Sequence, residues 1–213
     1  AANYARHRHV LQQTSGERCR RQLSISASKL SVASASFGSF GQYNNFCGAS
    51  NCIDGIKESR VHCRSGSSLC TSLAGHTNPW LQLDLGLTFA VQEVHVYNRL
   101  EACCTDRLGV HEIWVGSNPS NATAEGNALC GNDTASSTAI SITHQCNGGS
   151  LPGRYVYLLE PGSGRVISLQ EVEVFGSSLT VAPTTSGGIT QAPVPRTRGF
   201  DGAHTLVCAI RVV

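Results

Sequence analysis

The chain has 213 residues, of which 40% are hydrophobic and 14% charged, and its formal net charge is +2 at pH 7. This composition supplies enough apolar material for a core and too little charge for intrinsic disorder. The weak net charge argues against nucleic acid as a partner, and no run of 18 apolar residues is present that would span a bilayer.

The composition changes along the chain and indicates one central domain. Residues 1–21 form a polar, basic tail without apolar periodicity, and we assign residues 22–176 to the domain. Residues 177–198 are rich in Pro, Ser, Thr and Gly, which is typical of a linker. Residues 199–213 form a short C-terminal piece that is too small to fold alone and is left unassigned.

Apolar residues within the domain repeat with a period of two, which predicts β-strands. Gly, Pro, Asn or Ser bound each run, and no helical stripe competes with them. Many short strands separated by turn-rich loops favour an antiparallel, all-β sandwich or barrel. In chain order, the predicted strands cover residues 80–85, 89–96, 110–115, 139–142, 155–158 and 166–174.

The chain contains ten cysteines, which indicate disulfides and a secreted or cell-surface protein. Two sequons, Asn-Ala-Thr at Asn121 and Asn-Asp-Thr at Asn132, predict N-glycosylation and fit the same setting. The chain has no methionine and begins at Ala1, so we expect a processed chain or a fragment without its signal peptide.

The densest group of potential ligand side chains lies between two predicted strands, in residues 98–108 (Asn-Arg-Leu-Glu-Ala-Cys-Cys-Thr-Asp-Arg-Leu). If Cys103 and Cys104 bond to one another, they form a rigid, apolar eight-membered ring. A sugar could pack on its sulfurs while Arg99 and Arg107 donate forked hydrogen bonds to the sugar oxygens. Alternatively, each cysteine pairs elsewhere and both arginines are solvated.

This loop resembles the signature loop of F-type lectins, the fucose-binding (fucolectin) branch of the F5/8 type C, or discoidin, domains. The resemblance spans about residues 23–175 and implies an antiparallel jelly-roll β-sandwich of the galactose-binding-domain type. Only the Cys-Cys loop points to the lectin branch. The stretches that resemble the wider family are residues 51–55 (Asn-Cys-Ile-Asp-Gly), 78–85 (Asn-Pro-Trp-Leu-Gln-Leu-Asp-Leu), 153–156 (Gly-Arg-Tyr-Val) and 171–174 (Glu-Val-Glu-Val).

The chain departs from the lectin pattern at two points. In the family a histidine joins the two arginines in holding the sugar, but that position is Ser72 here. His76 lies four residues further on and is the candidate substitute, the alternative being a solvated loop histidine. Ala102 is an extra residue after Glu101, the acidic residue expected to orient Arg99. These departures predict an altered affinity or a different sugar.

The resemblance also implies a calcium ion that braces the loops near the binding face. Asp54 and Glu171 would provide carboxylates, and the other ligands would offer mostly backbone carbonyl oxygens, which suits the six to eight oxygen ligands that Ca²⁺ prefers. Alternatively, Asp54 caps a turn before Gly55. The other expected ligands are Asn51, Ile56, Leu69 and Gln170.

The disulfide pattern can be predicted only in part. In the family the cysteine at the Cys70 position pairs with one that Gln170 replaces here, so Cys70 needs another partner. Cys19 and Cys208 lie in the tails, and other pairings remain open because spacing does not determine connectivity. The expected pairs are Cys103–Cys104, Cys130–Cys146, which have the spacing of a family disulfide, Cys63–Cys70 and Cys47–Cys52.

The sequence contains none of the common enzyme signatures, such as G-x-S-x-G, H-E-x-x-H or a P-loop, and no paired C-x-x-C zinc motif. We therefore expect an extracellular, calcium-braced module, not an enzyme, that binds a fucose-like or other terminal sugar of a glycan or glycoprotein. It would act as an oligomer or as part of a multi-domain protein. The alternatives are an adhesion domain that binds a protein or membrane surface and a targeting domain of a secreted enzyme.

Overall fold

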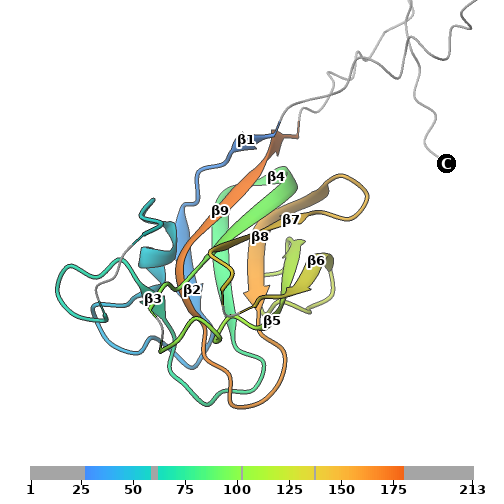
Figure 1. Cartoon of the computed structure of the whole chain (residues 1–213). Coiled ribbons are helices and arrows are strands. Elements are labelled where there is room, and N and C mark those ends of the chain that lie inside the picture. The colour runs from blue at the N-terminus through green and yellow to red at the C-terminus, as the bar shows by residue number, and fades with distance from the viewer. Residues whose placement is uncertain (1–26, 59–61, 102, 137, 180–213) are drawn as a thin grey trace, which may run out of the picture. The chain divides into compact units, whose positions relative to one another are not determined.

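The computed structural model describes residues 27–58, 62–101, 103–136 and 138–179, which form strands joined by loops (Figure 1). The predicted N-terminal tail, the C-terminal piece and most of the predicted linker lie outside these residues, as do Cys19, Ala102 and Cys208. Nothing helical in the described part of the chain is long and apolar enough to cross a membrane.

All strand pairings among the described residues are antiparallel, so the all-β, antiparallel prediction is confirmed. A single short 3-10 helix, η1, interrupts the series of strands in this part of the chain. In chain order the elements are β1 (Ser28–Lys29), β2 (Ser34–Phe37), η1 (Ala49–Ile53), β3 (Cys70–Thr71), β4 (Trp80–Asn98), β5 (Val110–Gly116), β6 (Asn127–Thr134), β7 (Ser141–Gln145), β8 (Leu151–Leu159) and β9 (Ser168–Ser178).

The 19-residue strand β4 takes part in both layers of the sandwich. Residues 81–84 pair with β2 and residues 80–84 and 89–91 with β8, whereas residues 89–98 pair with β9 and residues 93–97 with β7. The register with β8 shifts between Asp84 and Phe89, where Gly86 adopts a φ of 77°. The two strands predicted for residues 80–85 and 89–96 are therefore one strand with an irregularity between them.

A second irregularity in β4 keeps its apolar side chains directed into the core. Leu81, Leu83 and Val91 are buried at odd positions, but Val94 and Val96 are buried at even ones. The register with β9 shifts between Val91 and Glu93. Because one extra residue reverses the faces of a strand, this shift turns the later valines back inward.

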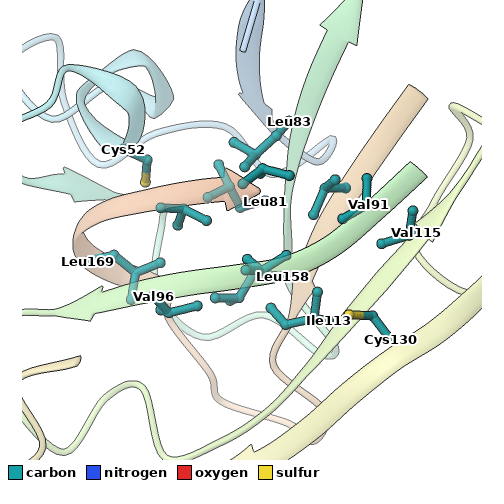
Figure 2. Packing of buried hydrophobic residues seen from close by; sticks show 14 of the residues in the cluster. Cys52, Leu81, Leu83, Val91, Val96, Ile113, Val115, Cys130, Leu158 and Leu169 are labelled. Carbon is teal, nitrogen blue, oxygen red and sulfur yellow. The ribbon is translucent and has the colours of Figure 1, made fainter. Parts of the chain in front are cut away.

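The core lies between the two layers and consists of the inward side chains of β4, β5, β8 and β9 (Figure 2). Each such side chain removed from water contributes roughly 1.5–3 kcal/mol. Those at most 2% exposed are Leu81, Leu83, Val91, Val94 and Val96 from β4, Ile113 and Val115 from β5, Val156 and Leu158 from β8, and Leu169, Val172 and Val174 from β9.

Four disulfides brace the described residues. Cys103–Cys104 and Cys130–Cys146 form as predicted. The predicted pairs Cys63–Cys70 and Cys47–Cys52 are wrong, because the structure pairs Cys47 with Cys63 and Cys52 with Cys70, each with 5.3 Å between the Cα atoms. Helix η1 packs against β3 and β9, so Cys52 enters the core beside Cys70 and Cys47 is left to close the loop that carries Cys63.

Candidate functional site

The loop that joins β4 to β5 is held at both ends by buried side chains. Asn98 is fully buried, and its Nδ2 donates to the carbonyl oxygens of Thr105 (2.9 Å) and Ala139 (3.0 Å), while its Oδ1 accepts from the amide of Arg99 (2.8 Å). At the far end Leu108 is fully buried in the core. The loop therefore presents the residues between these anchors in a defined arrangement.

Arg99 is only 5% exposed, and three segments orient its guanidinium. Its Nε donates to Glu101 Oε2 (2.7 Å), its Nη1 to Ser168 Oγ (3.0 Å), and its Nη2 lies 3.2 Å from His62 Nδ1. Glu101 thus pairs with Arg99. The other carboxylate oxygen, Oε1, is buried without a hydrogen-bond partner among the described residues and lies 3.8 Å from His62 Nδ1.

A cavity of about 260 Å³ opens beside Arg99. Within the described ranges, the guanidinium of Arg107 makes no hydrogen bond and no ion pair, and all its donors are available to a ligand. The cavity is small for a ligand site, which suits one sugar ring. Its lining residues are Tyr43, His62, Cys63, Thr71, Arg99 and Arg107.

The Cys47–Cys63 disulfide brings His62 to this cavity. Cys63 is the next residue in the chain, and its carbonyl oxygen accepts a hydrogen bond from Asn44 Nδ2 (3.0 Å). The side chain of His62 is 61% exposed, so its ring can contact a ligand while Nδ1 faces Arg99. His62 was not predicted as a site residue, because its only signal in the sequence is its place beside Cys63, whose predicted partner was wrong.

Ser72 and His76, the residues expected to complete the sugar site, lie elsewhere. Ser72 is fully buried, and its hydroxyl donates to the Leu73 carbonyl (3.0 Å) and accepts from the Ile167 amide (3.1 Å). The His76 ring packs against Phe40 with 4.8 Å between the ring centres. Neither residue lines the cavity, whereas His62 does.

The Cys103–Cys104 disulfide lies on the same loop as the two arginines, with Cys103 exposed and Cys104 buried. Neither cysteine is among the described residues that line the cavity. The exposed aromatic ring at the cavity is Tyr43, which is 59% exposed. Tyr43 therefore offers the apolar contact surface inside the cavity, and the disulfide stiffens the loop beside it.

The residues expected to hold calcium gather around η1. Asn51 Nδ2 lies 2.9 Å from the carbonyl oxygen of Phe46 and 3.1 Å from those of Ser67 and Leu69, so three carbonyl oxygens converge on this amide. Gln170, which precedes Glu171 in β9, is fully buried. The convergence of backbone oxygens suits a hard cation.

The two carboxylates of this group lie close together. Asp54 Oδ1 accepts from the Ile56 amide (2.8 Å), and Glu171 Oε2 accepts from the Gly55 amide (3.1 Å). Burial and the nearby Asp54 carboxylate raise the pKa of Glu171 to about 7. No three acidic, imidazole or thiol groups of the described residues cluster as metal ligands, so a cation here would depend on the carbonyl oxygens as well.

Both predicted glycosylation sites are exposed. Asn121 lies in the loop between β5 and β6, where the Thr123 hydroxyl donates to its Oδ1 (3.4 Å). Asn132 lies on the edge strand β6, opposite Glu112. Neither asparagine lines the cavity.

Comparison with protein families places this architecture among known domains. The family model of the NedA-like, galactose-binding domain of F5/8 type C matches residues 51–158. The chain is 34% identical to fucolectin-6 and 31% identical to fucolectin-3 of Anguilla japonica, each over 134 residues and 63% of this chain. It spans 66% and 69% of the length of these two relatives.

Solved structures agree with this placement. A fucolectin from the serum of the striped bass, Morone saxatilis, superposes with a TM-score of 0.58 at 32% identity, covering 67% of this chain and 46% of that one. A fucose binding module of Streptococcus pneumoniae has a TM-score of 0.55 at 23% identity, covers 73% of this chain and is itself covered completely. The latter shares the fold.

Proposed function

Because the chain belongs to the F-type lectin (fucolectin) family within the F5/8 type C domains, we propose that it is a lectin that binds a terminal, fucose-like sugar. The observation that carries this proposal is the cavity where Arg99 and Arg107 meet, one guanidinium oriented by the protein and the other without a partner among the described residues. Two relatives are named fucolectins and a third was isolated as a fucolectin from serum, which supports an extracellular setting.

The cavity offers the sugar mainly hydrogen-bond donors. Arg99 uses Nε and one N–H on each of its Nη atoms within the protein, which leaves two N–H groups for the ligand, and Arg107 offers all five. Planar guanidinium forks suit pairs of neighbouring oxygens, such as a ring oxygen and an adjacent hydroxyl. The Tyr43 ring can cover the apolar edge of the sugar.

His62 supplies a further polar contact. Because its Nδ1 accepts a hydrogen bond from Arg99, the neutral imidazole carries its proton on Nε2. Nε2 can then donate to a sugar hydroxyl. In this proposal His62 takes the part that the family histidine has at the position of Ser72.

We further propose that Ca²⁺ braces the loops beside the cavity. Asp54 and Glu171 would supply carboxylate oxygens, and the Leu69 carbonyl is one of the three oxygens that converge on Asn51. A bound cation would neutralise the buried Glu171 and hold η1 to β3 and β9. It would have a structural role.

Titration of the folded chain with L-fucose, followed by a glycan array, tests the sugar proposal. We expect saturable binding that Arg107→Ala weakens at least tenfold, since a charged hydrogen-bond pair contributes about 1.5–3 kcal/mol. Arg64→Ala is the matched control, because Arg64 is an exposed arginine two residues from His62 that does not line the cavity. No binding of any sugar by the unaltered chain would overturn the proposal. Binding to a glycoprotein that survives removal of its glycans would favour an adhesion domain.

A further inference from the structure

Arg165 lies in the loop between β8 and β9, but its side chain reaches the loop between β4 and β5. Its Nη2 lies 2.9 Å from the carbonyl oxygen of Val110, 3.0 Å from that of Leu108 and 3.3 Å from that of Arg107. One guanidinium nitrogen therefore contacts the carbonyl oxygen of the cavity arginine itself and those of two of the next three residues, Leu108 and Val110.

The backbone at this point bends around the guanidinium. Gly109 has a φ of 38°, in the left-handed region, and a Cβ atom there would lie 3.4 Å from both Nη atoms of Arg165. The Gly109 carbonyl points to the other side, where it accepts from the Ala135 amide and from His111 Nδ1, both at 2.9 Å. Among the described residues, Arg165 Nη2 is a hydrogen-bond partner of the other three carbonyl oxygens of this turn, those of Arg107, Leu108 and Val110.

Glu160 forms an ion pair with the Arg165 guanidinium. Its carboxylate is completely buried, and Oε2 lies 3.3 Å from both Nε and Nη2 of Arg165. Burial raises the pKa of Glu160 well above its ordinary value, and Arg165 opposes that rise. Since a buried carboxylate is costly without a cation, Glu160 and Arg165 stabilise each other in one geometry.

The main chain of Arg165 is also fixed by hydrogen bonds. Its amide donates to the His76 carbonyl (2.9 Å), and its own carbonyl accepts from the Gly75 amide (3.1 Å). The base of the side chain is thereby attached to a third loop. A guanidinium fixed at both ends can determine the position of the backbone that it contacts.

We propose that Arg165 is a positioning residue for sugar binding, which holds the backbone from Arg107 to Val110 so that the Arg107 guanidinium faces the cavity. The Arg107 guanidinium makes no hydrogen bond or ion pair in the described part of the chain, and beyond its longer-range attraction to Glu160 its direction depends on its backbone. A ligand group that is already oriented loses less conformational entropy on binding. This inference rests on the proposed sugar-binding function.

A double-mutant cycle on the full chain tests the inference, with L-fucose as the probe. In the otherwise unaltered chain, we expect Arg165→Gln to weaken binding about tenfold. In the Arg107→Lys variant, the same substitution should weaken binding further by less than about twofold, because the effects of residues that act through one another are not additive. Arg154→Gln is the matched control: its guanidinium forms a bidentate pair with Asp84, remote from the cavity, and the variant should bind normally.

Two further measurements keep the outcome clear. Arg165→Lys retains the charge beside Glu160 but lacks the planar fork, so it should fold and still bind weakly. Amide exchange at Arg107, whose N–H donates to the Cys104 carbonyl, should accelerate in both Arg165 variants. Equal losses in the Arg107 and Arg107→Lys backgrounds, or the same affinity for Arg165→Gln and Arg154→Gln, would overturn this inference alone. Failure of the unaltered chain to bind sugar would overturn the proposed function and this inference together.

Discussion

His62 Nδ1 lies 3.2 Å from Arg99 Nη2, although the two residues are 37 positions apart in the chain. The contact joins the segment closed by the Cys47–Cys63 disulfide to the loop between β4 and β5. The buried Oε1 of Glu101 lies 3.8 Å from the same imidazole nitrogen. His62 is thus the point at which two loops of the sugar site meet.

Removal of the His62 ring should weaken sugar binding. We expect His62→Ala to lower the affinity for L-fucose about tenfold, because it deletes one sugar contact and one partner of Arg99. His76→Ala is the control, since His76 packs on Phe40 outside the cavity. Titration calorimetry measures both, and the assignment is wrong if the His76 variant is the one that loses affinity.

Removal of either of two disulfides with the same spacing should lower stability equally, but only one removal should weaken sugar binding. Cys47–Cys63 and Cys130–Cys146 each close a separation of 16 residues, so replacing either pair with serine should cost about 3 kcal/mol of unfolding free energy. Only loss of Cys47–Cys63 should also weaken sugar binding, because only that pair holds His62 at the cavity. Denaturant unfolding and fucose titration of both double variants check this, and equal affinities would contradict it.

Acid should destabilise the fold through a buried histidine pair. His111 and His144 are at most 5% exposed, with 2.9 Å between their Nε2 atoms. Burial lowers the pKa of both, to about 4 for His144, where the neighbouring His111 contributes. Since an unfolded histidine titrates near pH 6.5, the unfolded chain binds more protons below that pH, and stability falls as the pH falls from 6.5 towards 4.

From His144 alone the loss between pH 7.5 and 5 should be about 2 kcal/mol. Denaturant unfolding across this range measures it. His144→Gln should reduce the dependence of the unfolding free energy on pH. His95→Gln, which alters a partly exposed histidine paired with Glu93, should leave it as steep as before, and a flat profile for the unaltered chain would contradict the argument.

Calcium should raise the melting temperature. At a concentration 100 times its Kd, a ligand that binds only the folded state adds about 2.7 kcal/mol, or roughly 5–10 °C for a chain of this size. Glu171→Gln should abolish this increment. Glu173→Gln should lower the melting temperature but retain the increment, because Lys29 and Lys57 already neutralise Glu173. A scan with and without EDTA distinguishes these results, and an unchanged increment in the Glu171 variant would exclude this site.

Period-two patterns predicted the strands whose alternate residues enter the core. They located β5, β8, β9 and both parts of β4, and placed β7 within a few residues. They missed β6, whose residues Asn127–Thr134 include only one buried side chain, Cys130, because an edge strand can be polar on both faces. Strands β1, β2 and β3 have two to four residues and are too short to show a period.

The site was predictable where it is contiguous in sequence. Arg99, Glu101 and Arg107 come from one loop, and the resemblance to F-type lectins identified them together. Tyr43 and His62 reach the cavity from a different part of the chain, at positions that depend on which cysteine pairs with Cys63. Sequence spacing leaves that connectivity open, so the predicted pairing of Cys63 with Cys70 gave no reason to place His62 beside Arg99.

The pairing of β1 with β9 determines how the domain can be joined to other chains. Ser28 lies opposite Gly176, so the strands by which the chain enters and leaves the sandwich are adjacent, at the top of Figure 1. Ser168, at the other end of β9, contacts Arg99, and eight residues of strand span about 26 Å. The domain could therefore be inserted into a surface loop of another protein or repeated in tandem. In either arrangement the cavity of each copy would lie at the end of the domain opposite its attachment point.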